Sequence, residues 1–141
     1  MSEIRTKISK KNPYYIGKYR YLELRYFCLQ YSVWKEAYNS LDGFSKRPQD
    51  LIASYIGTGD PTAKCAESKL FFKTKMNMVE NAAKDADPIL ANYILTGVTK
   101  GLTYDKIRAR TNIPCCRKTY YQLYRKFFYL LNKSQNSHLL L

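Results

Sequence analysis

Residues 101–131 read Gly101-Leu-Thr-Tyr-Asp-Lys-Ile-Arg-Ala-Arg-Thr-Asn-Ile-Pro-Cys-Cys-Arg-Lys-Thr-Tyr-Tyr-Gln-Leu-Tyr-Arg-Lys-Phe-Phe-Tyr-Leu-Leu131. This segment predicts a short helix, a tight turn and a longer helix rich in basic and aromatic residues. Thr103 is a suitable N-cap, and Ile107 is the inward apolar residue of the short helix. Asn112 tolerates the left-handed conformation of a turn, and Pro114 suits the start of the next helix. This order is the layout of a helix-turn-helix that reads DNA.

The second helix, expected over residues 115–132, separates its side chains by helical spacing. The inward positions are Tyr120, Leu123, Tyr124, Phe127, Leu130 and Leu131. The opposite face carries Lys118, Thr119, Gln122 and Lys126, with Arg117 and Arg125 at its flanks. All six are expected to bind nucleic acid.

Early exposed positions of the second helix of such a motif reach base edges. The side chains expected nearest to bases are Arg117, Lys118, Thr119 and Gln122. Basic residues outside that face are expected to meet phosphates, which position the domain without reading sequence. They are Lys100, Lys106, Arg108 and Arg110.

The motif departs from the usual pattern at two positions. A small residue early in the first helix and a glycine at the turn are typical, whereas this chain has Arg108 and Asn112. Arg108 must therefore point outward, or the register shifts by one residue. The alternative interpretation is an amphipathic helix pair whose basic outer face serves only as a scaffold.

The net charge of +13 is unevenly distributed over the 141 residues. Residues 1–48 hold ten Lys or Arg against four acids, residues 49–87 hold five against six, and residues 88–141 hold nine against one. Concentrated positive charge favours binding to a polyanion, most simply the phosphates of nucleic acid. A basic surface that only aids solubility is the alternative.

Upstream, residues 1–12 are expected to form a basic flexible arm, and residues 13–59 a helical region and loop. A long helix from Pro13 to about residue 40 carries a heptad-like stripe. The stripe is Tyr15, Tyr19, Leu22, Tyr26, Leu29 and Val33, widened by Tyr21, Leu24, Cys28 and Tyr31. It predicts either a core-forming helix or an intermolecular helix pair, and so a homodimer.

Two further helices are expected to start where an acidic residue precedes a proline, at Asp60-Pro61 and at Asp87-Pro88. The first helix should run from about 61 to 86, and the second should stop near Gly101. Residues 60–132 are therefore expected to form a helical region with the helix-turn-helix at about 101–132, followed by a tail over 133–141. No period-two alternation is found, so the fold class is all-α.

The residues give no support for catalysis or metal binding. One histidine, His138, accompanies four cysteines without zinc-site spacing, and the acids are scattered. We expect no enzyme activity, no cofactor and no metal. No apolar run is long enough to span a membrane and no signal peptide is recognisable, so a cytoplasmic location is expected.

Gly101-Leu-Thr-Tyr-Asp-Lys-Ile107 resembles the start of the sigma-factor region 4 helix-turn-helix. With Asp60-Pro61, Asp87-Pro88 and the helix that follows Pro114, most of the chain resembles small ArpU/RinA-type transcriptional regulators of Firmicutes prophages and integrative elements. The resemblance implies a phage-type regulator with a C-terminal unit that binds double-stranded DNA. Its N-terminal helices would scaffold, dimerise or contact RNA polymerase, in a bacterial host cell.

A second class of function stays open. Small helical proteins of mobile elements also block host nucleic-acid enzymes or ribonucleoproteins, including those of RNA-guided immunity. Fourteen tyrosines near basic residues suit an interface of that kind.

Overall fold

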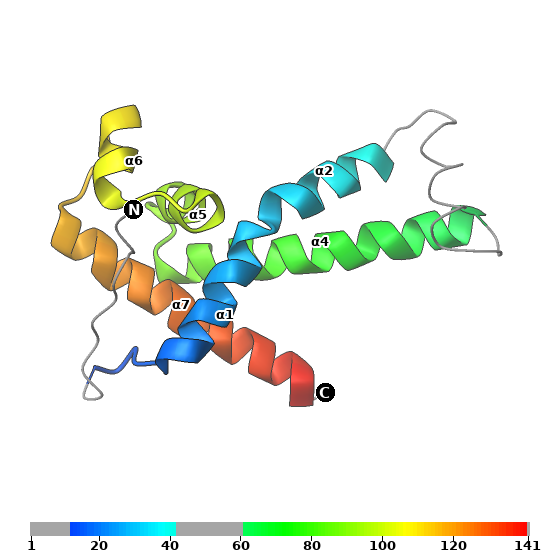
Figure 1. Ribbon diagram of the computed structural model, residues 1–141, viewed down its shortest axis with the longest axis horizontal. Helices are drawn as coiled ribbons and strands as arrows, with labels where there is room; N and C mark the ends of the chain where they lie inside the picture. The colour runs from blue at the N-terminus through cyan, green and yellow to red at the C-terminus, as the bar shows by residue number, and fades with distance from the viewer. Residues whose placement is uncertain (1–11, 42–60, 141) are drawn as a thin grey trace. The chain divides into compact units, whose positions relative to one another are not determined.

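The computed structural model describes residues 12–41 and 61–140, and within these ranges it contains helices and no strand. The helices are α1 (Lys18–Leu29), α2 (Tyr31–Leu41), α4 (Pro61–Ala86), α5 (Ala91–Lys100), α6 (Tyr104–Arg110) and α7 (Arg117–Leu140) (Figure 1). The all-α prediction is confirmed. None of these helices combines the length and the apolar character that crossing a membrane requires.

The chain divides into two compact units, and each is described by itself. The larger unit comprises Met1–Leu29 and Met78–Leu141, and the smaller comprises Gln30–Asn77. The larger unit therefore holds α1, the end of α4, and α5 to α7. In the smaller unit, Trp34, Leu41 and Met76 are buried, and the Lys75 ammonium lies 5.6 Å from the centre of the Trp34 ring.

The core of the larger unit is built on α7. Tyr120, Tyr124, Phe127 and Leu131 are at most 1% exposed, as the helical spacing predicts. Phe128 is equally buried and was not among the predicted inward residues, whereas Leu123 and Leu130 are only half-buried. The inward face is thus turned slightly toward Phe128.

The helix α7 begins later and ends later than its sequence predicts. Pro114 lies in the connection, and Cys116 is the last residue before the helix, where its carbonyl accepts the Tyr120 N–H at 3.0 Å. At the other end the helix continues to Leu140, so the predicted tail is wrong for residues 133–140. Neither glycine nor proline interrupts residues 133–140, so nothing local stops the helix.

Helix α1 packs on α7 (Figure 1). The Arg20 guanidinium donates through Nε to Asn132 Oδ1 at 2.7 Å and through Nη2 to Gln135 Oε1 at 2.9 Å. The hydroxyls of Tyr21 and Tyr124 share a hydrogen bond of 2.6 Å inside the core. Residues from both ends of the chain thus form one core.

The predicted long N-terminal helix begins at Lys18 instead of Pro13 and is interrupted at Gln30, and its predicted inward stripe is wrong. Tyr19 and Tyr26 are 77% and 61% exposed, whereas Leu24 and Cys28 are fully buried. The second set of apolar residues, predicted only to widen the face, is the face that packs. Helical spacing gives the separation of neighbours on a helix, but two apolar stripes leave open which one meets the core.

The local signals around α4 and α5 were informative. The bounds of α4 are those predicted, and the proposed cap Asp60 lies outside the described residues. The predicted start of the next helix at Pro88 is wrong, because α5 begins at Ala91. Asp87 Oδ1 accepts the backbone N–H groups of Ile89 and Leu90 at 2.8 and 3.1 Å, so it caps the turn before α5 and not the helix itself. Gly101 ends α5 with φ of 65°, a left-handed conformation that glycine adopts without strain.

Of the predicted arm, residues 1–12, only Asn12 is described. Of the predicted helical region and loop, residues 13–59, the structure describes residues 13–41 and the rest lies outside the described residues. The described part of the predicted 60–132 region agrees with its helical assignment.

Candidate nucleic-acid interface

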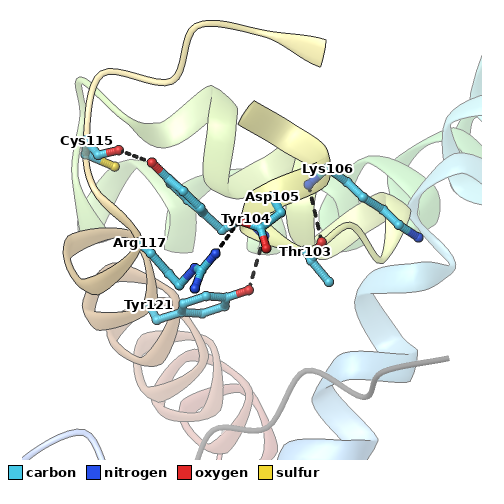
Figure 2. A network of polar contacts seen from close by, with 7 residues as sticks. All are labelled: Thr103, Tyr104, Asp105, Lys106, Cys115, Arg117 and Tyr121. Atoms are coloured by element: carbon cyan, nitrogen blue, oxygen red, sulfur yellow. Dashed lines mark hydrogen bonds and ion pairs between the residues drawn. The ribbon is translucent and has the colours of Figure 1, made fainter. Parts of the chain in front are cut away.

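Helices α6 and α7 are joined by residues 111–116 and held together by a buried tyrosine. The Tyr104 hydroxyl donates to the Cys115 carbonyl at 2.5 Å, and the Tyr104 N–H donates to the Tyr121 hydroxyl at 3.1 Å (Figure 2). Tyr104 is 5% exposed, and its ring centre lies 5.7 Å from that of Tyr120. One side chain therefore fixes the start of α6 to the connection and to α7.

The predicted N-cap of α6 is confirmed. The Thr103 hydroxyl oxygen accepts the Lys106 N–H at 3.3 Å, in the geometry of a capped first turn (Figure 2). Ile107 is 2% exposed, and Arg108 points to solvent, as the predicted register requires.

The predicted turn conformation at Asn112 is wrong. No described residue other than glycine has a positive φ. Helix α6 ends instead in extended backbone at Thr111, whose N–H still donates to the Ile107 carbonyl. A six-residue connection has room to reverse direction without a left-handed residue, which a tight turn would need.

Arg117, predicted to face bases, is paired with Asp105. Its Nη2 lies 2.5 Å from the Asp105 carboxylate oxygen, between the first turn of α6 and the first turn of α7 (Figure 2). Both side chains are about two-thirds exposed, at 64% and 66%. Since the pair is accessible to water, it orients the guanidinium more than it stabilises the fold.

The remaining predicted residues fall into three groups. Lys118, Thr119 and Gln122 are exposed on the first two turns of α7. Lys106 and Arg110 are exposed one turn apart on α6, and Lys100 is exposed at the end of α5. Arg125 and Lys126 are only half-buried and lie further along α7.

A hollow of about 390 Å³ separates the starts of α6 and α7. Its walls include Tyr104, Arg108, Cys115, Cys116 and Arg117. Two of the predicted cations, Arg108 and Arg117, are therefore brought to one place although they come from different helices.

Cys116 was not predicted to be part of the site. Its exposed Sγ lies 3.3 Å from the Thr119 hydroxyl oxygen, and this contact lowers the pKa of the thiol. Its neighbour Cys115 is less exposed, and burial raises the pKa of that thiol. The Thr119 hydroxyl, expected to touch DNA, thus already has a partner at the start of α7.

The contacts made by Tyr104, Tyr121 and Asp105 were also missed. Asp105 is the only acid in residues 88–141, and that isolation is the sequence signal from which its pairing with a basic residue could have been inferred. The tyrosine contacts depend on the path of the connection, which sequence does not reveal.

All four cysteines are free thiols. Within residues 12–41 and 61–140, no group of three His, Cys, Asp or Glu side chains is placed to hold a metal ion.

Comparison with protein-family models, curated proteins and solved structures finds no match to this chain. What the surface of α6 and α7 binds has therefore to be inferred from its charge, its shape and its exposed side chains.

Proposed function

We propose that this protein binds double-stranded DNA with a sequence preference, as a transcriptional regulator of the phage type. The observation that carries the proposal is the arrangement of the first two turns of α7. Lys118, Thr119 and Gln122 are exposed there, while Tyr120 and Tyr124 of the same turns are fixed in the core. Polar side chains held on a rigid helix are what reading of the major groove requires.

The arrangement of α5, α6 and α7 supports a helix-turn-helix reading. The short α6 precedes the longer α7, and both pack on α5. The resemblance to sigma region 4 belongs to this proposal, with Thr103 capping the first helix. The connection of residues 111–116 is longer than the three or four residues usual in such motifs.

The charge of the region supports a phosphate-binding role around that face. Residues 88–141 carry nine basic residues and one acid. Lys106, Arg108 and Arg110 are exposed on α6, and Arg108 lines the same hollow as Arg117 of α7. Contacts of this kind give an affinity whose logarithm falls linearly with the logarithm of salt concentration.

Asp105 has a specific place in the proposal. A carboxylate on a DNA-binding face repels phosphate, so its presence needs a compensating role. Its contact with Arg117 supplies one, because a guanidinium held in one orientation can pair with guanine through two hydrogen bonds. On this reading Asp105 positions Arg117 toward the groove.

Selection of bound sequences from a random duplex pool, followed by affinity measurements over a salt series, tests the proposal. We expect an enriched motif and a linear salt dependence. Lys118→Glu should reduce affinity at least tenfold, with unchanged helical circular dichroism. The matched control is Lys35→Glu, the same charge change at an exposed position of α2 in the smaller unit.

Equal weakening by Lys118→Glu and Lys35→Glu would show that only total charge matters. A bound pool without enrichment would refute sequence preference.

A second candidate function is inhibition of a host ribonucleoprotein, and exposed apolar side chains favour it. Tyr19 and Tyr26 on α1, and Leu70 and Phe71 on α4, are each more than half exposed. Such side chains are typical of protein interfaces. Cleavage assays with a purified RNA-guided nuclease test this candidate: inhibition should be lost in Tyr19→Ser/Tyr26→Ser and kept in Lys118→Glu.

A further inference from the structure

A second hollow lies beside α7, further from its start than the proposed base-reading positions. It has a volume of about 390 Å³, with Asn12 and Tyr14 on one side and Gln122, Arg125 and Lys126 on the other. All of these residues belong to the larger unit. The volume falls in the range of small-ligand sites.

The wall formed by the N-terminal turn has a defined structure. The Tyr14 N–H donates to Asn12 Oδ1 at 2.8 Å, and the Tyr15 N–H donates to the Asn12 carbonyl at 3.0 Å. The Tyr14 ring lies against the Tyr129 ring of α7, with centres 5.5 Å apart. Since the Asn12 side-chain oxygen is engaged as an acceptor, its NH₂ group supplies donors.

Among the described residues, none compensates the positive charge in the hollow. Arg125 is half-buried, and its enclosed Nε has no hydrogen-bond partner among the described residues. Lys126 is the adjacent cation, and none of the residues that line the hollow is acidic. A partly desolvated guanidinium without a counter-charge is unfavourable, and a bound anion would remove that cost.

From this chemistry we infer that the hollow is a phosphate-binding pocket. Arg, Lys and amide side chains are all donors, and the planar guanidinium fork matches two oxygens of a phosphate. Two kinds of ligand carry a phosphate group: the backbone of nucleic acid and a free phosphorylated small molecule.

The DNA backbone is the source that the position of the pocket favours, and this choice rests on the proposed function. Gln122 lines the pocket and also lies one turn after Lys118 on the exposed face. A duplex that contacts Lys118 and Gln122 therefore brings its backbone to the mouth of the pocket. One phosphate would then be held between α7 and the N-terminal turn.

The experiment compares inorganic phosphate and duplex DNA as probes of the full chain. Phosphate titration is followed by NMR through the Arg125 Nε–H signal and the Asn12 and Gln122 side-chain amides. DNA affinity is measured by fluorescence anisotropy over a salt series. The variants are Arg125→Gln and Lys126→Gln, and the control is Lys133→Gln, an exposed cation further along α7.

We expect phosphate to shift these signals in the wild type and in Lys133→Gln, with at least tenfold weaker binding in Lys126→Gln. For DNA, each pocket variant should reduce the slope of log affinity against log salt by about 1, with the selected motif unchanged. Lys126→Gln keeps the test decisive if Arg125→Gln fails to fold.

Other outcomes separate the pocket from the proposed function. Absence of phosphate-induced shifts overturns the pocket even if the protein binds DNA through Lys118. Phosphate binding that depends on Lys126, in a protein without affinity for DNA, supports the pocket and refutes the proposed function. Loss of phosphate binding with an unchanged DNA salt slope overturns the DNA backbone as the source and leaves the free small molecule.

Discussion

Gly97 of α5 lies against Tyr120 of α7 without room for a side chain. A Cβ atom at this position would overlap the hydroxyl oxygen of Tyr120 and would lie 3.0 Å from Ile107 Cδ1. The Tyr120 hydroxyl is itself buried and has no hydrogen-bond partner among the described residues. Glycine in a helix interior is unfavourable by up to ~1 kcal/mol relative to alanine, so its presence here reflects the lack of space.

Gly97→Ala should therefore destabilise the protein by ~1–3 kcal/mol through overpacking, despite the better helix propensity of alanine. Tyr120→Phe should be neutral or stabilising, because it removes a buried hydroxyl that lacks a partner. In the Tyr120→Phe background, Gly97→Ala should cost clearly less. Urea unfolding of the four proteins measures this coupling, and an equal cost in both backgrounds would contradict it.

The cysteines differ sharply in environment. Cys116 is exposed, and hydrogen bonding to Thr119 lowers the pKa of its thiol. Cys28 is fully buried, and burial raises the pKa of its thiol. The thiolate is the reactive species, so a lowered pKa increases reactivity near neutral pH.

Alkylation of the native protein should therefore modify Cys116 first and leave Cys28 untouched until unfolding. The half-maximal rate for Cys116 should occur at a lower pH than for Cys115, whose pKa is raised. Mass spectrometry of peptides after timed alkylation across a pH series measures both rates. In Thr119→Val the pH profile of Cys116 should move upward, and an unchanged profile would remove Thr119 as the cause.

At the scale of elements, α1 has two tyrosine-bearing faces with different roles. Leu24 is fully buried on the packed face, whereas Tyr19 and Tyr26 are exposed. Leu24→Ala should cost ~2–5 kcal/mol through loss of buried surface and the cavity left behind. Tyr19→Ser should change the free energy of unfolding of the monomer by under ~0.5 kcal/mol.

Urea unfolding at several protein concentrations checks this contrast between the faces. A large cost for Tyr19→Ser that grows with protein concentration would show instead that the exposed stripe is buried between two copies, the helix pair that its heptad spacing allows.

The elements that sequence predicted well carry their own local signals. Pro61 and Gly101 mark helix ends because proline restricts the backbone conformations that are accessible and glycine extends them. The inward face of α7 was largely found because its aromatic residues form a single stripe. The face of α1 was missed because tyrosine, with an apolar ring and a polar hydroxyl, suits both water and the core.

In the candidate site, too, features set by local sequence were predicted, whereas contacts between elements were not. Exposure of Lys118 and Gln122 follows from helical spacing, and it was predicted. The pairing of Arg117 with Asp105 and the contact of Tyr104 with Cys115 join different elements. Such contacts depend on the backbone path through residues 111–116, which no local propensity specifies.

At the scale of the whole molecule, burial among the described residues is concentrated in one of the two units. The largest side chains that are under 2% exposed all belong to the larger unit, among them Leu24, Tyr120 and Phe127. The part of the smaller unit that the structure describes buries Trp34, Leu41 and Met76, each between 3% and 8% exposed. Regions with fewer buried apolar side chains open at lower free energy, so the smaller unit should unfold first.

The single tryptophan makes this order measurable, since Trp34 lies in the smaller unit and every other large reporter is tyrosine or phenylalanine. In a urea titration, Trp34 fluorescence should change at lower urea than amide exchange protection in α5 and α7. Leu131→Ala should lower the second midpoint, because it costs ~2–5 kcal/mol in the larger core, and should leave the first nearly unchanged. If the two transitions coincide and shift together in Leu131→Ala, the smaller unit unfolds only together with the larger one. In that case α4 transmits the loss of order along its full length.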